Sequence, residues 1–161
     1  MNALLEGPRD TFAEKPTQKE PERICFLCTR NSARSLIAET LMRHLAGDRF
    51  EVLSAGLRPG EVHPLTLRVL EEKRFATDHL RSKGVETVMG RVGVRYAVIV
   101  CEEAEATCPR IYPFATQTLR WPFPDPAAVS GDEEDQLRAF RDVRDQIERR
   151  IRAWLADPTS A

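Results

Sequence analysis

Short apolar runs recur along the chain and predict the strands of a buried sheet. Residues 24–27 and 96–100 are continuous apolar runs, a pattern typical of parallel strands that are covered on both faces. Residues 50–55, which end at Gly56, and the shorter segment 119–123 predict two more strands.

The segments between these runs carry apolar residues at helical spacing. From Ser35 onward such residues recur every three or four positions until Gly47, a natural C-terminal stop. A second helix is predicted around 67–70. In the region 75–93 we expect a loop and a short helix around 85–89. A long amphipathic helix is predicted over 137–154, where it would cover one sheet face.

Strands that alternate with helices predict an α/β fold, an open, doubly wound, four-stranded parallel sheet with helices on both faces. Ligands of such sheets bind at the carboxyl ends of the strands. Cys28, Cys101 and the segment after Phe123 all fall at that edge, so three distant parts of the sequence should meet at one site. We expect a single α/β domain over 23–157. Residues 1–22 carry three prolines and no periodicity, which predicts a mobile extension.

The composition argues against several classes of partner. A net charge of -1, with 30% charged residues, offers no broad basic surface for nucleic acid or for an anionic membrane. No apolar run is long enough to span a bilayer, and the N-terminus lacks the apolar core of a signal peptide. We therefore expect a cytoplasmic protein that binds neither nucleic acid nor membrane. Four cysteines in such a protein indicate reactive, metal-binding or buried thiols rather than a disulfide framework.

The first strand runs into a polar loop between Cys28 and Arg34, and Ser35 is a candidate helix start. A loop that opens a helix turns its backbone N–H groups inward, which makes an anion site. We expect Cys28 to be a thiolate at neutral pH, because the helix N-terminus and the guanidinium stabilise negative charge. Arg34 can hold a tetrahedral oxyanion through two N–H donors. The alternative is a core cysteine followed by a polar turn, and the flanking strand and helix favour the anion site.

This loop resembles the phosphate-binding loop of the low-molecular-weight tyrosine phosphatase family and of the arsenate reductases that share its fold. The resemblance covers roughly residues 23–155 and implies a phosphatase-like fold. By this resemblance Cys28 is the nucleophile, Arg34 clamps the oxyanion, Ser35 stabilises the thiolate and Asn31 braces the loop backbone. The implied substrate-binding residues are Thr29, Arg30, Asn31, Ser32, Ala33 and Arg34.

The pair Asp125-Pro126 stands near the C-terminus, where this family keeps its general acid. Asp125 would protonate the leaving oxygen. A carboxyl on a proline-flanked loop at the sheet edge can be held over the site and partly desolvated. For this pair alone, a plain Asp-Pro turn would be the favoured interpretation; together with the loop motif, catalysis is favoured.

Cys101 and Cys108 distinguish the two branches of the family. The run Cys101-x6-Cys108-Pro109 resembles the redox pair of thioredoxin-coupled arsenate reductases, and segment 121–126 also looks like theirs. The resemblance implies that Cys28 attacks arsenate and that Cys101 then attacks Cys28 and releases arsenite. Cys108 would move the disulfide outward to a pair that a thioredoxin-like reductant reaches.

The spacing of this pair constrains its structure. A helix over 101–108 would hold its ends ~10 Å apart, whereas a disulfide requires Cα atoms within about 7 Å. The segment must therefore loop or unwind during turnover. Two unrelated cysteines, with Cys101 in the core, remain the alternative.

Cys25 and Cys28 also form a Cys-x-x-Cys, a pattern found in thioredoxin-like and zinc sites. Residues three apart on a strand point to opposite faces, so we expect Cys25 to be a buried, small apolar residue. His44, His63 and His79 are scattered. We predict no metal and no tightly bound cofactor, with reducing equivalents supplied by thioredoxin or a similar thiol reductant.

The residues around the loop also bear on substrate size. A tyrosine phosphatase seats an aromatic ring against bulky walls, whereas small residues, Ala127, Ala128 and Val129, follow Asp125-Pro126. The site therefore favours a small inorganic oxyanion, although Tyr112 and Phe114 could approach it.

We therefore predict a thioredoxin-dependent arsenate reductase that uses Cys28, Cys101 and Cys108 and could retain some phosphatase activity. The first alternative is a phosphatase, for which Cys28, Arg34 and Asp125 suffice. The second is a non-catalytic oxyanion or redox sensor that keeps the loop as a binding site.

Overall fold

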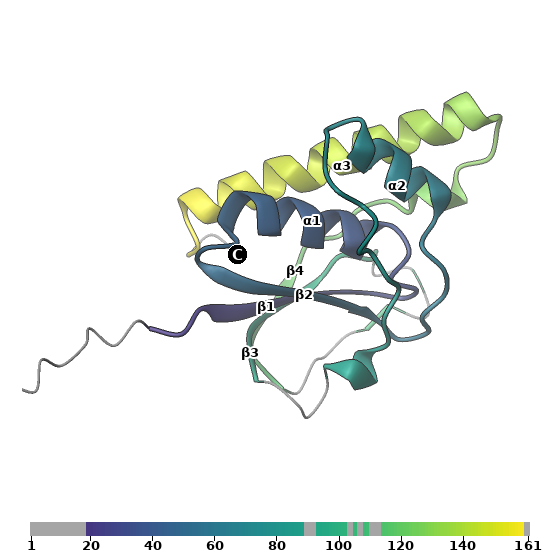
Figure 1. Cartoon of the computed structure of the whole chain (residues 1–161). Helices are drawn as coiled ribbons and strands as arrows, with labels where there is room; N and C mark the ends of the chain where they lie inside the picture. The colour runs from purple at the N-terminus through teal and green to yellow at the C-terminus, as the bar shows by residue number, and fades with distance from the viewer. Residues whose placement is uncertain (1–18, 89–92, 103–104, 106–107, 110–113, 160–161) are drawn as a thin grey trace, which may run out of the picture.

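Four parallel strands form one sheet in the order β2-β1-β3-β4. The computed structural model describes residues 19–88, 93–102, 105, 108–109 and 114–159 (Figure 1). The strands are β1 (Glu22–Cys28), β2 (Phe50–Gly56), β3 (Val94–Ile99) and β4 (Ala115–Arg120). The predicted α/β class and the four-stranded parallel sheet are confirmed.

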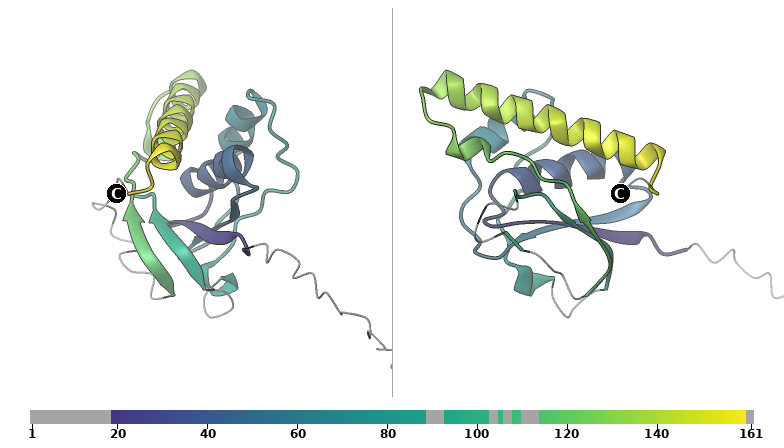
Figure 2. Two further views of the ribbon diagram at one scale, coloured as in Figure 1. Left: turned by 90° about the vertical axis from the view of Figure 1, so that its left-hand side faces the viewer. Right: turned by 180° about the vertical axis from the view of Figure 1, so that it is seen from behind.

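Three α-helices lie together on one face of the sheet (Figures 1 and 2). They are α1 (Arg34–Ala46), α2 (Pro64–Glu71) and α3 (Glu133–Ala156). The other face packs against the segment of the 3-10 helix η1 (Val85–Thr87), beside a smaller apolar cluster that includes Cys25, Leu27 and Ala97. Helices thus meet both faces, but unequally, and the main core lies under the three α-helices.

The long helix α3 forms where its apolar positions predict it. Asp132 caps its N-terminus by accepting a hydrogen bond from the Asp135 amide at 2.9 Å. Three acidic residues in the first turn complement the positive end of the helix dipole. Near its C-terminus, Trp154 is buried against the rings of Phe50, Tyr96 and Trp121. This contact holds α3 to the sheet.

The predicted bounds of the last strand, 119–123, were wrong. β4 is the edge strand Ala115–Arg120, and most of its side chains are exposed, so no apolar run marks it. The alternating buried residues Leu119, Trp121 and Phe123 shifted the prediction toward the C-terminus. Beyond the end of β4, the chain still runs beside the end of β3. The Trp121 amide donates to the Ile99 carbonyl at 2.9 Å and the Phe123 amide to the Val100 carbonyl at 3.1 Å.

Two other predictions fall partly outside the described residues. The short helix expected around 85–89 is present as η1 (Val85–Thr87), and residue 89 is outside the described range. The extension 1–22 stays a prediction, since the described chain starts at residue 19 and β1 begins at Glu22. No helix in the described part of the chain has the length and apolarity needed to cross a bilayer.

The strand order creates a crevice at the carboxyl edge of the sheet. β1 and β3 are neighbours, but the chain leaves β1 toward β2 and leaves β3 toward β4. The Val100 amide donates to the Leu27 carbonyl at 3.0 Å, so Cys28 and Cys101 leave adjacent strands at the same edge. This switch point is where α/β sheets bind ligands.

Replacing Trp154 by alanine tests the contact between α3 and the sheet. We expect Trp154→Ala to lower the free energy of unfolding by about 3–5 kcal/mol, because it leaves a large cavity among three aromatic rings. Urea unfolding followed by circular dichroism measures the change. Arg149→Ala, at an exposed position of the same helix, is the matched control and should stay within about 0.5 kcal/mol of the wild type.

Candidate active site

The loop between β1 and α1 presents its carbonyl groups outward to the segment that follows β2. The carbonyls of Thr29, Arg30 and Ser32 accept hydrogen bonds from the backbone amides of Arg58 at 2.8 Å, Gly60 at 3.1 Å and His63 at 3.0 Å. The C=O and N–H of one peptide unit point in opposite directions. Holding these carbonyls outside therefore turns the amides of residues 30, 31 and 33 inward, as an anion-binding nest requires.

Gly56 lets this loop lie directly against the end of β2. A Cβ at this position would lie 2.7 Å from the Asn31 nitrogen, 2.8 Å from the Arg30 carbonyl carbon and 2.9 Å from the Thr29 oxygen. All three are backbone atoms, so a side chain here would displace the loop. The sequence identified Gly56 as a strand end, and its position opposite the loop was visible only in the fold.

The sulfur of Cys28 lies inside the loop and receives two polar contacts. The Asn31 amide donates to Sγ at 3.1 Å, and Ser35 Oγ lies 2.8 Å from it. Ser35 Oγ also accepts a hydrogen bond from Asn31 Nδ2 at 2.8 Å, and its own proton is free to be donated to a Cys28 thiolate. Both contacts stabilise negative charge on Cys28.

Asn31 joins the loop to β2 and to the segment before η1 by hydrogen bonds. It is fully buried and has a positive φ of 51°, a conformation that asparagine tolerates better than most residues. Its Nδ2 also donates to Ser54 Oγ at 3.0 Å, and its Oδ1 accepts from the Lys83 amide at 2.8 Å. Asn31 therefore lies where a residue that braces the loop would lie.

Three supporting residues were not predicted from the sequence. Ser54 Oγ donates to Glu39 Oε2 at 2.5 Å, and the Lys83 ammonium lies 3.4 Å from the same oxygen. Glu39 is buried on α1 one turn beyond Ser35. An acidic residue on the otherwise buried face of a predicted helix was the available signal.

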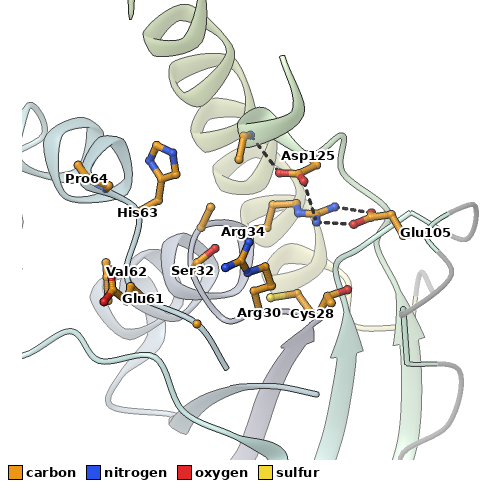
Figure 3. A pocket seen from close by; sticks show the side chains of 14 residues that line it. Cys28, Arg30, Ser32, Arg34, Glu61, Val62, His63, Pro64, Glu105 and Asp125 are labelled. Carbon is orange, nitrogen blue, oxygen red and sulfur yellow. Dashed lines mark hydrogen bonds and ion pairs between the residues drawn. The ribbon is translucent and has the colours of Figure 1, made fainter. Parts of the chain in front are cut away.

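Arg34 is buried and surrounded by anionic groups (Figure 3). Its Nη1 and Nη2 each donate to a carboxylate oxygen of Glu105 at 2.7 Å, and Nη1 also donates to the Phe123 carbonyl at 3.0 Å. Burial acts to lower the pKa of Arg34, but the hydrogen bonds to Glu105 and the neighbouring negative charges outweigh it, and the pKa is raised. The hydrogen bond from Arg34 in turn lowers the pKa of Glu105.

Asp125 lies at the mouth of the same site. Its Oδ1 caps the short helix η2 (Pro126–Ala128) by accepting from the Ala127 amide at 3.0 Å, while Oδ2 lies 4.0 Å from Arg34 Nη2. The structure thus joins the loop to the segment after Phe123, as the position of both at the sheet edge predicted. His63, which was not predicted as a site residue, also lines this pocket.

His63 is oriented by its own backbone. Its Nδ1 accepts a hydrogen bond from the Leu65 amide at 3.1 Å, which leaves the proton of the neutral ring on Nε2. Burial lowers the pKa of His63, and the charge of Asp125 only partly opposes this. The ring is therefore neutral at physiological pH.

The pocket is a cavity of about 640 Å³ that these groups share (Figure 3). Cys28, Arg30, Arg34, His63 and Asp125 contribute to its walls, together with Glu61, Val62 and Pro64. No Phe, Tyr or Trp from the described ranges lines it. Phe114 is 45% exposed and is not part of the wall, while Tyr112 is outside the described residues.

Cys101 and Cys108 form a disulfide on either side of Glu105, a residue of the pocket wall, and their Cα atoms lie 5.8 Å apart. The two residues therefore meet within the disulfide range, which a continuous helix over 101–108 would not allow. Cys101 is buried and Cys108 is partly exposed. The pair thus has one member toward the core and one toward the surface.

Cys25 lies on the opposite side of β1 from Cys28, as predicted. It is fully buried in the apolar cluster of the η1 face. Burial, together with the negative charge of Glu39, raises the pKa of its thiol to about 12. In the ranges that the structure describes, no group of three or more His, Cys, Asp or Glu side chains is arranged to hold a metal ion.

Over most of its length the chain is similar to known proteins. The family described as low molecular weight phosphotyrosine protein phosphatase matches residues 23–160. An arsenate reductase of Halalkalibacterium halodurans is 32% identical over 131 residues, which cover 81% of this chain and 93% of that protein.

The chain is also similar to solved structures of arsenate reductases. The structure of an arsenate reductase in its oxidized state has a TM-score of 0.68 and 25% identity, and covers 84% of this chain and 97% of that one. A thioredoxin-dependent arsenate reductase of Corynebacterium glutamicum has a TM-score of 0.60 and 27% identity, over 88% of this chain and 64% of that one.

Gly56→Ala tests whether the loop depends on its close approach to β2. We expect the variant to bind inorganic phosphate at least about tenfold more weakly, because the added methyl group displaces the amides that face the anion. Isothermal titration calorimetry of the thiol-reduced protein measures the affinity. Gly93→Ala is the matched control, since a Cβ at Gly93 meets nothing within 4 Å. Equal affinities in the two variants would contradict the dependence.

Alkylation distinguishes the two free thiols. In the folded, disulfide-containing protein at pH 8, we expect iodoacetamide to modify Cys28, which lines the pocket, and to leave Cys25 unmodified, because Cys25 is buried and ionises only near its pKa of about 12. Peptide mass spectrometry locates the adduct. Unfolding in urea should expose both thiols, and comparable rates of modification in the folded protein would refute the assignment.

Proposed function

This chain belongs to the low molecular weight phosphotyrosine protein phosphatase family, and from this premise we propose that it is an arsenate reductase. The observation that carries the proposal is the Cys101–Cys108 disulfide. Cys101 follows the strand next to the one that ends at Cys28, and Glu105, between the two cysteines, lines the pocket. Hydrolysis of a phosphate ester needs one nucleophilic thiol, whereas reduction of arsenate needs two electrons, which a pair of thiols supplies when it becomes a disulfide. Relatives named arsenate reductases support the same activity.

Arsenate binds in the loop in this proposal. The inward amides of residues 30, 31 and 33 face its oxygens, and Arg34 donates two hydrogen bonds to them. The short side chains of Thr29, Ser32 and Ala33 leave space for a compact tetrahedral anion. The missing aromatic wall in the described part of the pocket agrees with a small substrate.

The first step joins sulfur to arsenic. The Cys28 thiolate attacks arsenic(V), one As–O bond breaks, and the oxygen leaves as water after taking a proton from Asp125. Arsenic keeps its oxidation state in this step. The product is a covalent adduct in which Cys28 Sγ replaces one oxygen of arsenate.

The second step transfers the electrons. The Cys101 thiolate attacks Cys28 Sγ, a Cys28–Cys101 disulfide forms, and the electron pair of the broken S–As bond stays on arsenic. Arsenic is thereby reduced to arsenic(III) and leaves as arsenite, which takes up protons from water. Neighbouring strands lie about 4.8 Å apart, and the hydrogen bond between Val100 and Leu27 brings the two cysteines to the ends of such neighbours.

The third step restores the nucleophile. The Cys108 thiolate attacks Cys101 Sγ, which frees Cys28 as a thiolate and leaves the Cys101–Cys108 disulfide. A thioredoxin-like dithiol then reduces this disulfide with two electrons and two protons. In total, arsenate and two thiols give arsenite, water and one disulfide. Because such a cycle requires a reducing compartment, we also propose a cytoplasmic location.

Cys108→Ser tests the relay. We expect arsenate turnover to fall at least about 100-fold, because the Cys28–Cys101 disulfide cannot be passed on, while hydrolysis of p-nitrophenyl phosphate stays within about twofold. Arsenate-dependent NADPH oxidation with thioredoxin and thioredoxin reductase measures the first activity. We expect Cys101→Ser to lose arsenate turnover and to keep phosphate-ester hydrolysis in the same way.

Cys25→Ala is the control for loss of a thiol outside the relay. Near-normal arsenate turnover by Cys108→Ser would overturn the relay, because the Cys28–Cys101 disulfide would then be reduced without Cys108. Phosphate-ester hydrolysis without any arsenate turnover in the wild-type protein would favour a phosphatase. Loss of both activities in the reduced wild-type protein would favour a sensor.

A further inference from the structure

In the disulfide form, the carboxylate of Glu105 accepts the hydrogen bonds by which Arg34 would hold the substrate. Both terminal nitrogens of Arg34 donate to Glu105, one to each oxygen, at 2.7 Å. This paired geometry is the one in which arginine binds an oxyanion. Glu105 also lines the same pocket as Cys28 and Asp125 (Figure 3).

The position of Glu105 is tied to the disulfide. It stands between Cys101 and Cys108, whose Cα atoms the bond holds 5.8 Å apart. The Glu102 amide donates to the Glu105 carboxylate at 2.7 Å, and the Cys108 amide donates to the Glu105 carbonyl at 3.0 Å. Residues at both sides of Glu105 therefore hold it within the ring of chain that the disulfide closes.

We propose that Glu105 is a redox-gated positioning residue that replaces the oxyanion on Arg34 when the Cys101–Cys108 disulfide forms and releases Arg34 when the disulfide is reduced. This inference rests on the proposed function for its place in the cycle. Formation of the disulfide would close the anion site at the step after arsenite has left. The oxidised protein would then bind neither product nor any competing oxyanion until a reductant acts.

Electrostatics make the two occupants exclusive. Arg34 has one pair of terminal nitrogens facing the pocket, and Glu105 uses both. An oxyanion placed beside the ionised carboxylate would meet like charge in a partly buried site, with Asp125 as a third anionic group 4.0 Å from Arg34. The hydrogen bond from Arg34 lowers the pKa of Glu105, so the carboxylate stays ionised at neutral pH.

Chain entropy connects the exclusion to the redox state. A short closed loop presents Glu105 to Arg34 at a high effective concentration. Opening the disulfide gives the segment more freedom, so that the carboxylate competes less well with a free anion.

Phosphate binding tests the proposal without any turnover. Isothermal titration calorimetry with inorganic phosphate compares the wild type, Glu105→Gln and Glu102→Gln, each with the disulfide intact and after reduction. We expect oxidised Glu105→Gln to bind phosphate at least about tenfold more tightly than the oxidised wild type, because the competing charge is gone. In the reduced proteins the three affinities should agree within about threefold.

Glu102→Gln is the matched control, because it removes the same charge from the same loop at an exposed position. The proposal is overturned if oxidised Glu105→Gln binds phosphate no more tightly than the oxidised wild type, or no more tightly than oxidised Glu102→Gln. It is also overturned if the gain is equally large in the reduced proteins, since Glu105 would then be a fixed competitor. Arsenate reduction is measured in a separate assay. If the protein does not reduce arsenate, the phosphate affinities still show whether Glu105 competes with the anion.

Discussion

The direction of a few peptide units is the constraint on which the site depends. The carbonyls of the Cys28–Arg34 loop are held outside by amides of the segment after β2, so the opposite ends of those peptides face the inside of the loop. Gly56 makes this possible, because any side chain there would occupy the space of the loop backbone. The contact of the Asn31 amide with Cys28 Sγ is a direct result. β2 and the segment that follows it thus help to shape the site.

A buried arginine among several anions is the second organising feature. Arg34 lies near Glu105, Asp125 and Cys28, and their combined charge keeps the guanidinium protonated despite its burial. The same arrangement means that the anions compete. Removing one partner from a buried charge costs far more than exchanging it for another of like charge. Arg34 therefore favours a handover between Glu105 and substrate over a state in which it has neither.

Much of the fold and the core of the site could be predicted from the sequence, for reasons that the structure makes clear. Buried strands and amphipathic helices leave periodic patterns, and the rule that ligands bind at the carboxyl edge of such sheets predicts that Cys28, Cys101 and Asp125 lie together. β4 was misplaced because an exposed edge strand lacks an apolar pattern. Glu105, Gly56 and the partners of Asn31 were not identified, because their roles depend on contacts between segments that are distant in sequence. A local pattern contains no information about such contacts.

The segment that carries electrons is also the segment that carries the competing carboxylate. Cys101, Glu105 and Cys108 are within eight consecutive residues. The disulfide that forms in the last step of the proposed cycle also holds the Glu105 carboxylate against Arg34. A separate gating loop would need its own means of sensing the redox state. Here the sensing bond and the blocking group share one short ring of chain, so closure of the anion site follows from formation of the disulfide. The distance from Cys28 to this segment along the sequence is large, but adjacent strands make it short in the fold.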